Sequence, residues 1–256
     1  MDTTAGNEKM KILVLFIFSF CSNAYAQNIT FKEIKLKPNA KFYDVNETTI
    51  IYPVVVTDNK LIDKLINNKI REEILEENEK ANIRTALNER INDGLINMSY
   101  EVTFKKNSIL SMNIYAEGCG AYCSSWYTYF NFDLKTGKEI PISDLISGNK
   151  LDSFQKIVFT DKQKFLNQYK EEEHESFIKN EIDSDTYHWA IEQVDSNCFK
   201  DVQIENFSLS NLSMAIIDPC EFPHVIRSQQ PVYELKYSYK FLLPFLKPKF
   251  QEQFLK

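Results

Sequence analysis

The sequence predicts an α+β fold in which an antiparallel β-sheet packs against helices. Three observations predict this fold class. A stretch with helical periodicity follows two strand-like segments near the start of the chain. Two segments with two-residue alternation come next, joined by a short polar turn. A second helical stretch then separates these strands from further short strands near the end of the chain.

The first part of the chain is expected to hold two strands and two helices. Residues 29–37 and 49–56 are the expected strands, and Thr57 or Asp58 is expected to cap the helix that follows. A second helical stretch ends at Gly94. In the first helix six apolar residues recur at helical spacing and form one stripe, namely Leu61, Ile62, Leu65, Ile66, Ile70 and Ile74.

The centre of the chain is expected to form three strands. Apolar and polar residues alternate over 98–105 and again over 110–115, and the polar turn 106–108 predicts a hairpin between them. In the third strand, 126–134, aromatic residues occupy both faces near the start. The alternating positions are Met98, Tyr100, Val102 and Phe104 in the first segment, Leu110, Met112 and Ile114 in the second, and Trp126, Thr128, Phe130 and Phe132 in the third.

The second half of the chain is expected to begin with a turn at 135–138 and a short capped helix at Ser143 and Asp144. Residues 149–190 then have a helical pattern. The remaining expected elements are short strands at 202–209 and 212–217, and a strand followed by a short helix over 231–247.

The N-terminal residues are typical of a signal peptide. The apolar run 12–20 follows a short positive start at Met10 and Lys11 and is too short to span a bilayer. The Ala-Tyr-Ala sequence at 24–26 is typical of a signal-peptidase site, so Gln27 is the expected mature N-terminus. The protein is therefore expected to be periplasmic or extracellular.

Two alternatives concern the same segment. The acidic residues before Met10 do not suit a signal peptide, which makes a translation start at Met10 an alternative to Met1. Cys21 offers a lipoprotein reading, although the bulky Phe20 precedes it where a small residue is usual. No later segment is apolar enough to be a stable membrane span.

The rest of the chain shows no repeat, low-complexity linker or clear boundary. Residues 27–256 are therefore expected to form one α+β domain, with 27–96 as a possible N-terminal subdomain. The formal net charge of -6 argues against nucleic-acid binding, which requires a basic face. Aromatic residues make up 13% of the chain, enough for both a core and a binding surface.

Four cysteines remain after the expected cleavage, and an even number in an exported chain predicts disulfides. Of the three possible connectivities we favour Cys119–Cys123 and Cys198–Cys220, since the first pair lies in one turn and the second flanks one strand pair. A four-thiolate zinc site is the rival interpretation, but only the first pair has the usual spacing. A thioredoxin-type site would need C-x-x-C, which is absent.

No catalytic motif stands out. His174 lies in an acidic helical stretch and His188 beside Trp189 is expected to be packed, whereas His224 lies in an irregular loop and is the histidine of greatest interest. The chain has no H-E-x-x-H or G-x-S-x-G sequence, and its 6 glycines do not form a phosphate-binding loop. No cofactor is expected.

The segment Phe130-Asn131-Phe132-Asp133-Leu134-Lys135-Thr136-Gly137-Lys138, followed by Ile142-Ser143-Asp144-Leu145, resembles a known family. It is similar to the domain of unknown function in the extracellular half of the bacterial anti-sigma factor RsiV. The same type of domain accompanies some peptidoglycan deacetylases. The resemblance extends over about 49–247, and it implies an exported domain that can bind lysozyme.

The chain departs from that family in two loops. The family often has a Gly-Gly-Ala-His loop before the aromatic strand, whereas residues 118–123 here contain two cysteines and no histidine. A glycine-containing stretch before the last strand is replaced by residues 218–224. Lysozyme binding is therefore an expectation from the resemblance only.

Two classes of function follow. The first is a non-catalytic binding domain of the cell envelope that recognises a protein such as lysozyme, or a cell-wall glycan. The second is an envelope hydrolase that acts on peptidoglycan or its modifications, using His224 with a nearby carboxylate. The residues expected at the binding surface are Tyr122, Trp126, Tyr127, Tyr129 and His224.

Overall fold

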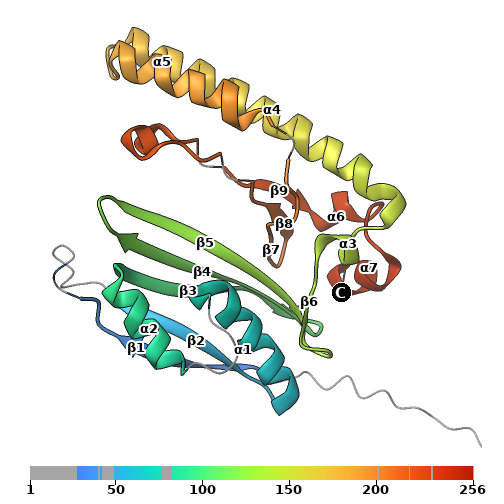
Figure 1. Ribbon diagram of the computed structural model, residues 1–256. Helices are drawn as coiled ribbons and strands as arrows, with labels where there is room; N and C mark the ends of the chain where they lie inside the picture. The colour runs from blue at the N-terminus through green and yellow to red at the C-terminus, as the bar shows by residue number, and fades with distance from the viewer. Residues whose placement is uncertain are drawn as a thin grey trace, which may run out of the picture.

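The computed structural model describes residues 28–39, 41, 49–76, 82–200, 202–218, 220–231 and 233–255. The expected signal peptide and Cys21 lie outside these residues, as does the side chain of His224. The described chain has an α+β fold, as predicted, with a six-stranded sheet, a three-stranded sheet and covering helices (Figure 1).

The large sheet follows chain order from one edge to the other. Its strands are β1 (Thr30–Leu36), β2 (Ile50–Val56), β3 (Leu95–Lys106), β4 (Ile109–Cys119), β5 (Cys123–Asp133) and β6 (Lys138–Glu139). All neighbours are antiparallel except β2 and β3, which run parallel. The large sheet is therefore mixed and not purely antiparallel, because two helices lie between β2 and β3 and return the chain to the same end of the sheet.

Those two helices, α1 (Lys60–Leu75) and α2 (Ile83–Asn92), cover one face of the large sheet (Figure 1). The isoleucines of the predicted stripe are buried against β2 to β5. Leu61 and Leu65 are not, with 65% and 40% of their surfaces exposed. Each lies about 100° around the helix from the isoleucine after it, so the buried stripe is narrower than predicted. Leu65 instead packs against the turn at Gly137.

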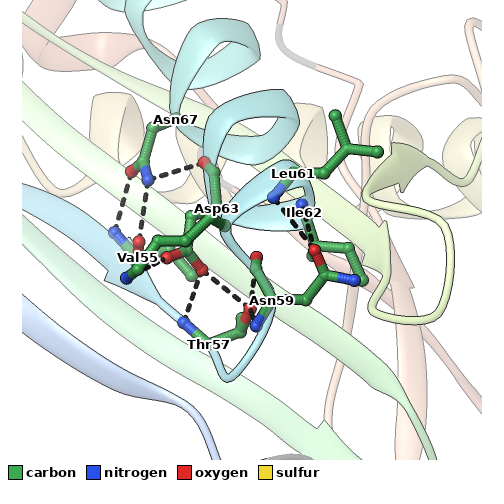
Figure 2. Close-up of polar contacts among 8 residues, drawn as sticks. Val55, Thr57, Asn59, Leu61, Ile62, Asp63 and Asn67 are labelled. Carbon is green, nitrogen blue, oxygen red and sulfur yellow. Dashed lines mark hydrogen bonds and ion pairs between the residues drawn. The ribbon is translucent and has the colours of Figure 1, made fainter.

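The start of α1 is fixed by a polar network (Figure 2). The cap is Asn59, not Thr57 or Asp58, and its side chain accepts from the backbone N–H groups of Leu61 and Ile62. Thr57 lies two residues before the cap, where its hydroxyl donates to Asp63 Oδ1 at 2.7 Å and its backbone N–H donates to the same oxygen at 2.6 Å. Partial burial opposes ionisation of Asp63, but these bonds and the Lys60 ammonium outweigh it and lower its pKa.

Asn67 joins the same helix to β2. Its side-chain amide accepts from the Val55 N–H at 2.8 Å and donates to the Val55 carbonyl at 2.7 Å (Figure 2). Among the described residues, β2 pairs with β3 only at Ile50 and Met98. At Val55 the side-chain amide of Asn67 therefore takes the place of a neighbouring strand.

The second sheet packs on the opposite face of the large sheet. It contains β7 (Phe207–Leu209), β8 (Ser213–Ile216) and β9 (Leu235–Ser238), all antiparallel. The Ser111 hydroxyl accepts from Leu209 N–H at 3.0 Å, and Asn131 Nδ2 donates to the Phe207 carbonyl at 2.8 Å. These two buried bonds fix β7 across β4 and β5.

A register shift in β3 places Phe104 at the interface between the two sheets. The register shifts between Val102 and Phe104, so Phe104 pairs with Ser111 and packs in the core that includes β7 and β8. Met98, Tyr100 and Val102 stay on the side of α1 and α2. A bulge inserts one residue and breaks the two-residue alternation, which the sequence pattern alone did not reveal.

The remaining helices cover the second sheet. The helical pattern predicted over 149–190 is two helices, a long α4 (Gly148–Ile178) and an α5 (Ser184–Gln193) that folds back along it (Figure 1). The short helix α3 (Ile142–Leu145) follows Pro141 and has no side-chain cap, contrary to the expectation at Ser143 and Asp144. The other elements are the π-helix η1 (Val194–Cys198), the 3-10 helix η2 (His224–Gln229), α6 (Tyr239–Leu242) and α7 (Pro248–Leu255).

Candidate binding site

The end of the β4–β5 hairpin, residues 115–129, is called the hairpin tip below. The disulfide between Cys119 and Cys123 closes it, and these two residues are also the last pair of the strand register. The Gly120 N–H donates to the Tyr122 carbonyl at 3.0 Å within the turn. The predicted pairing is confirmed, as is the second disulfide, Cys198–Cys220. Because all four sulfurs are in disulfides, they are not available as zinc ligands.

The strand alternation divides the predicted binding residues between two faces. Trp126 pairs with Ala116 and lies on the same face as Phe130 and Phe132, toward the side of α1 and α2. Tyr127 and Tyr129 lie on the opposite face, toward the second sheet. The structure therefore does not bring the four aromatic residues together on one surface.

On the face of the second sheet, three tyrosines form a row, called here the tyrosine row: Tyr115, Tyr127 and Tyr129. The ring centroids of Tyr115 and Tyr127 are 5.1 Å apart, and those of Tyr127 and Tyr129 are 6.2 Å apart. Tyr127 is 55% exposed, while the two flanking tyrosines are partly buried. The row thus presents one accessible ring supported on both sides by neighbouring rings.

Two glutamates, Glu117 and Glu234, lie near the tyrosine row. The Tyr115 hydroxyl donates to Glu117 Oε2 at 3.4 Å. Burial raises the pKa of Tyr115, and the nearby Glu117 carboxylate raises it further. Burial also raises the pKa of Tyr129 to about 12, with added contributions from Glu234 and Tyr127. The hydroxyls of Tyr115 and Tyr129 therefore stay protonated at neutral pH and can donate hydrogen bonds to a partner.

On the other face, a hollow opens where α2 ends and no longer covers the strands. This Trp126 cavity has a volume of about 230 Å³. Its walls come from the end of α2, the start of β3 and both strands of the hairpin tip, with Arg90, Asp93, Met98, Tyr122, Ser124 and Trp126 among the lining residues. Two of the predicted binding residues, Tyr122 and Trp126, therefore line one cavity.

Glycines shape the base of this cavity. A Cβ atom on Gly118 would lie 3.4 Å from the far edge of the Trp126 indole, so the ring reaches along the strand and rests over that glycine. Gly94 has a φ of +112°, and a Cβ atom there would lie 2.1 Å from the Cys119 carbonyl oxygen. The Gly94 carbonyl accepts from Cys119 N–H at 2.8 Å. The backbones of the α2–β3 connection and the disulfide turn therefore touch directly.

Polar groups stand at the rim of the cavity. The Arg90 guanidinium forms an ion pair with Glu76 at 2.7 Å and a hydrogen bond to the Ile74 carbonyl at 3.4 Å. Asp93 is exposed, and within the described part of the chain its carboxylate has no ion-pair partner. The cavity thus combines one guanidinium, one carboxylate and aromatic rings.

The histidines do not form a catalytic group within the described residues. His174 is exposed, and its Nδ1 lies 3.2 Å from the Tyr187 hydroxyl. His188 was expected to be packed but is exposed, with its ring near those of Tyr187 and Phe177. His224 begins η2, and the position of its imidazole is outside the described structure.

A second hollow lies beside the Cys198–Cys220 disulfide, between η1 and residues 221–223. It is shallow and lined mainly by polar side chains, including Asn197, Lys200 and Glu221. No cluster of histidine, cysteine, aspartate or glutamate suited to a metal ion occurs in the described ranges. Within the same ranges, no helix is both long enough and apolar enough to cross a membrane.

Sequence reasoning missed three residues of this region. Arg90 and Asp93 were not singled out in the second helical stretch, and Tyr115 was only one of the polar positions in an alternating strand. The signal for Tyr115 was present, because a hairpin register places it opposite Tyr127. The position of Arg90 and Asp93 depends on how α2 lies against β3, for which the sequence carried no signal.

Comparison with known proteins identifies the fold. No protein-family model matches the sequence, and no curated protein is significantly similar to it. Two crystal structures of DUF3298 family proteins are similar. One, from Bacteroides fragilis, has a TM-score of 0.56 and 13% identity, covering 90% of this chain and 97% of that chain. The other, from Pseudomonas aeruginosa PAO1, has a TM-score of 0.54 and 12% identity, and the match covers 87% of this chain and 95% of that chain. The chain has the fold of these DUF3298 proteins.

Proposed function

We propose that this chain is an exported, non-catalytic binding domain of the cell envelope, and that the hairpin tip is its binding surface. The fold shared with the DUF3298 structures and the resemblance of residues 130–145 to the RsiV extracellular domain support a common type of domain. That resemblance suggests lysozyme-like proteins as one partner class, and a cell-wall glycan is the other.

The observation that carries this proposal is the exposure of aromatic rings on both faces of a strand end closed by a disulfide. Tyr122, Trp126 and Tyr127 are 64%, 44% and 55% exposed. Large exposed aromatic side chains are costly on a surface without a partner and are favoured anchors in interfaces. The disulfide reduces the loss of entropy when a partner docks, because the tip is already ordered.

The charge around the tyrosine row suits a basic partner. Glu117 and Glu234 lie beside it, and the whole chain has a formal net charge of -6. Complementary charge increases the rate of encounter and disfavours acidic partners. A hydrolase that uses His224 is the alternative, and no observation among the described residues favours it.

The test is a binding assay of the mature protein with lysozyme and with purified, insoluble peptidoglycan. Tyr127→Ala is expected to weaken binding at least tenfold, about 1.4 kcal/mol, while the thermal midpoint of unfolding stays nearly unchanged because the ring is exposed. Trp189→Ala is the matched control, since Trp189 is an exposed aromatic residue on α5, away from the hairpin tip.

The proposal would be refuted if the protein bound neither ligand, or if Tyr127→Ala and Trp189→Ala had the same effect. A large fall in the thermal midpoint of Tyr127→Ala would instead assign this ring a structural role. Hydrolysis of peptidoglycan that disappears in His224→Ala would favour the enzyme.

A further inference from the structure

The Trp126 cavity lies on the opposite face of the hairpin tip from the tyrosine row, so a ligand bound in it would not contact the row. We propose that this cavity is a carbohydrate site that holds one neutral sugar ring. The inference deepens the proposed function and rests on it, since a glycan of the envelope would supply the ring.

The volume of the cavity limits the size of the ligand. At about 230 Å³ it is smaller than the roughly 300–1,000 Å³ typical of pockets for drug-sized ligands. A peptide segment or a nucleotide would not fit, whereas one six-membered sugar ring with its substituents would. The cavity opens to solvent at the hairpin tip, so the rest of a glycan chain could extend outward from it.

The Trp126 indole provides the surface that sugar rings require. Its faces carry excess negative charge from the π-system, and the axial C–H groups of a sugar ring are slightly positive. Gly118 beneath the ring has no side chain, which lets the indole lie along the strand while 44% of its residue surface stays exposed. Tyr122 lines the same cavity and brings a second aromatic ring to its opening.

The lining of the cavity favours a neutral ligand over an ion. An aromatic cage for a quaternary ammonium group surrounds the cation with several rings, whereas Tyr122 and Trp126 are the two aromatic residues among those that line this cavity. Asp93 would repel a phosphate or a carboxylate. A sugar hydroxyl both donates and accepts, so it can bond to the Asp93 oxygens, to the Arg90 N–H groups and to the Ser124 hydroxyl.

The walls of the cavity are held in place before any ligand arrives. The Glu76 carboxylate and the Ile74 carbonyl orient Arg90. The Cys119–Cys123 disulfide and the bond from Cys119 N–H to the Gly94 carbonyl fix the turn against the α2–β3 connection. A preformed site loses little entropy on binding, which matters for a weak ligand such as a single sugar.

The two tryptophans of the chain make a direct test possible. In Trp189→Phe the fluorescence comes from Trp126 alone and the cavity is untouched. Titration with the trisaccharide of N-acetylglucosamine and with cellotriose should change this fluorescence saturably, with a Kd on the order of 0.1–1 mM for at least one of them. A response to the first sugar alone would indicate an N-acetylated glycan as the source.

Two variants locate the effect. Trp126→Phe, which keeps Trp189, should show no fluorescence response to either sugar. Asp93→Asn, made in the Trp189→Phe background, should weaken sugar binding several-fold, because an amide is a poorer acceptor for hydroxyl groups than a carboxylate. Equal sugar responses from Trp126→Phe and Trp189→Phe would show that the site is elsewhere and overturn the inference.

The remaining outcomes separate this inference from the proposed function. No response to either sugar, or a response to choline alone, would overturn the carbohydrate site. If lysozyme or peptidoglycan binding then persisted and depended on Tyr127, the proposed binding function would stand without it. A sugar response in the absence of lysozyme binding would support the site and leave glycan recognition as the function.

Discussion

Single backbone positions decide how the two halves of the Trp126 cavity meet. Gly94 ends the α2–β3 connection with a φ of +112°, a conformation in which side chains are strained. Gly120, in the disulfide turn on the other side, has no atom within 4 Å of its would-be Cβ. The two glycines are thus neighbours in space with opposite tolerance to substitution.

Gly94→Ala is therefore expected to destabilise the protein, and the strained backbone conformation alone contributes about 1–3 kcal/mol. The added Cβ would also lie 2.1 Å from the Cys119 carbonyl oxygen, which forces the turn away. The free energy of unfolding in urea measures the effect. Gly120→Ala is the matched control and should change it by less than about 0.5 kcal/mol. Equal values for the two variants would contradict this account.

The aromatic residues of the hairpin tip could be identified from the sequence, but they were predicted to form one binding surface. Alternation already placed Trp126 and Tyr127 on opposite faces of β5. The alternation does not reveal where α2 stops covering one of those faces, because the position of α2 depends on contacts between residues far apart in the chain. The cavity, and with it Arg90 and Asp93, was for this reason not predicted.

At the level of elements, local sequence patterns predicted where the strands and helices lie in the chain. They predicted less well which strands pair with each other. The hairpin of β3 and β4 followed from alternation and a polar turn, and Asn107 and Ser108 adopt the positive φ values that such a tight turn uses. The parallel pairing of β2 and β3 and the bulge before Phe104 did not follow, because both are set by packing across the sheet.

The junction of α1 and β2 depends on a single side chain. Asn67→Ala is expected to lower the free energy of unfolding by about 2–3 kcal/mol, because it leaves the Val55 N–H and carbonyl groups without partners in a partly buried place. Glu72→Ala, an exposed position of the same helix, is the control and should have little effect. Chemical denaturation compares the two, and a loss below about 0.5 kcal/mol for Asn67→Ala would show that water replaces the amide.

At the scale of the whole molecule, the large sheet separates two cores. One lies under α1 and α2, and the other lies between the sheet and α4, α6 and α7 (Figure 1). A third, smaller cluster surrounds the Cys198–Cys220 disulfide. The buried ion pair of Lys162 and Asp218, at 2.5 Å, connects α4 to the segment that enters this cluster.

Buried tyrosines in all parts of the molecule predict sensitivity to alkali. Burial raises the pKa of Tyr129 to about 12 and raises the pKa of Tyr52, Tyr233 and Tyr239 further. A raised pKa means that the folded state holds its protons more tightly than the unfolded state. The resulting stability is complete below the unfolded pKa of about 10 and is lost as pH rises above it.

The thermal midpoint should therefore be steady between about pH 7 and 9 and fall steeply above about pH 10. The part of the tyrosinate absorbance that comes from these buried tyrosines should appear together with unfolding and not before it. Full ionisation of all tyrosines in a protein that stays folded would contradict the burial described here.

The disulfide of the hairpin tip has unequal ends, since Cys119 is 2% exposed and Cys123 is on the surface. An attacking thiolate can approach the sulfur of Cys123 far more readily, and that attack expels the sulfur of Cys119. The departing thiolate would form in an apolar setting that opposes its charge, so it leaves slowly. Small thiols should consequently exchange sluggishly with this bond, which gives the tip chemical durability in addition to its mechanical rigidity.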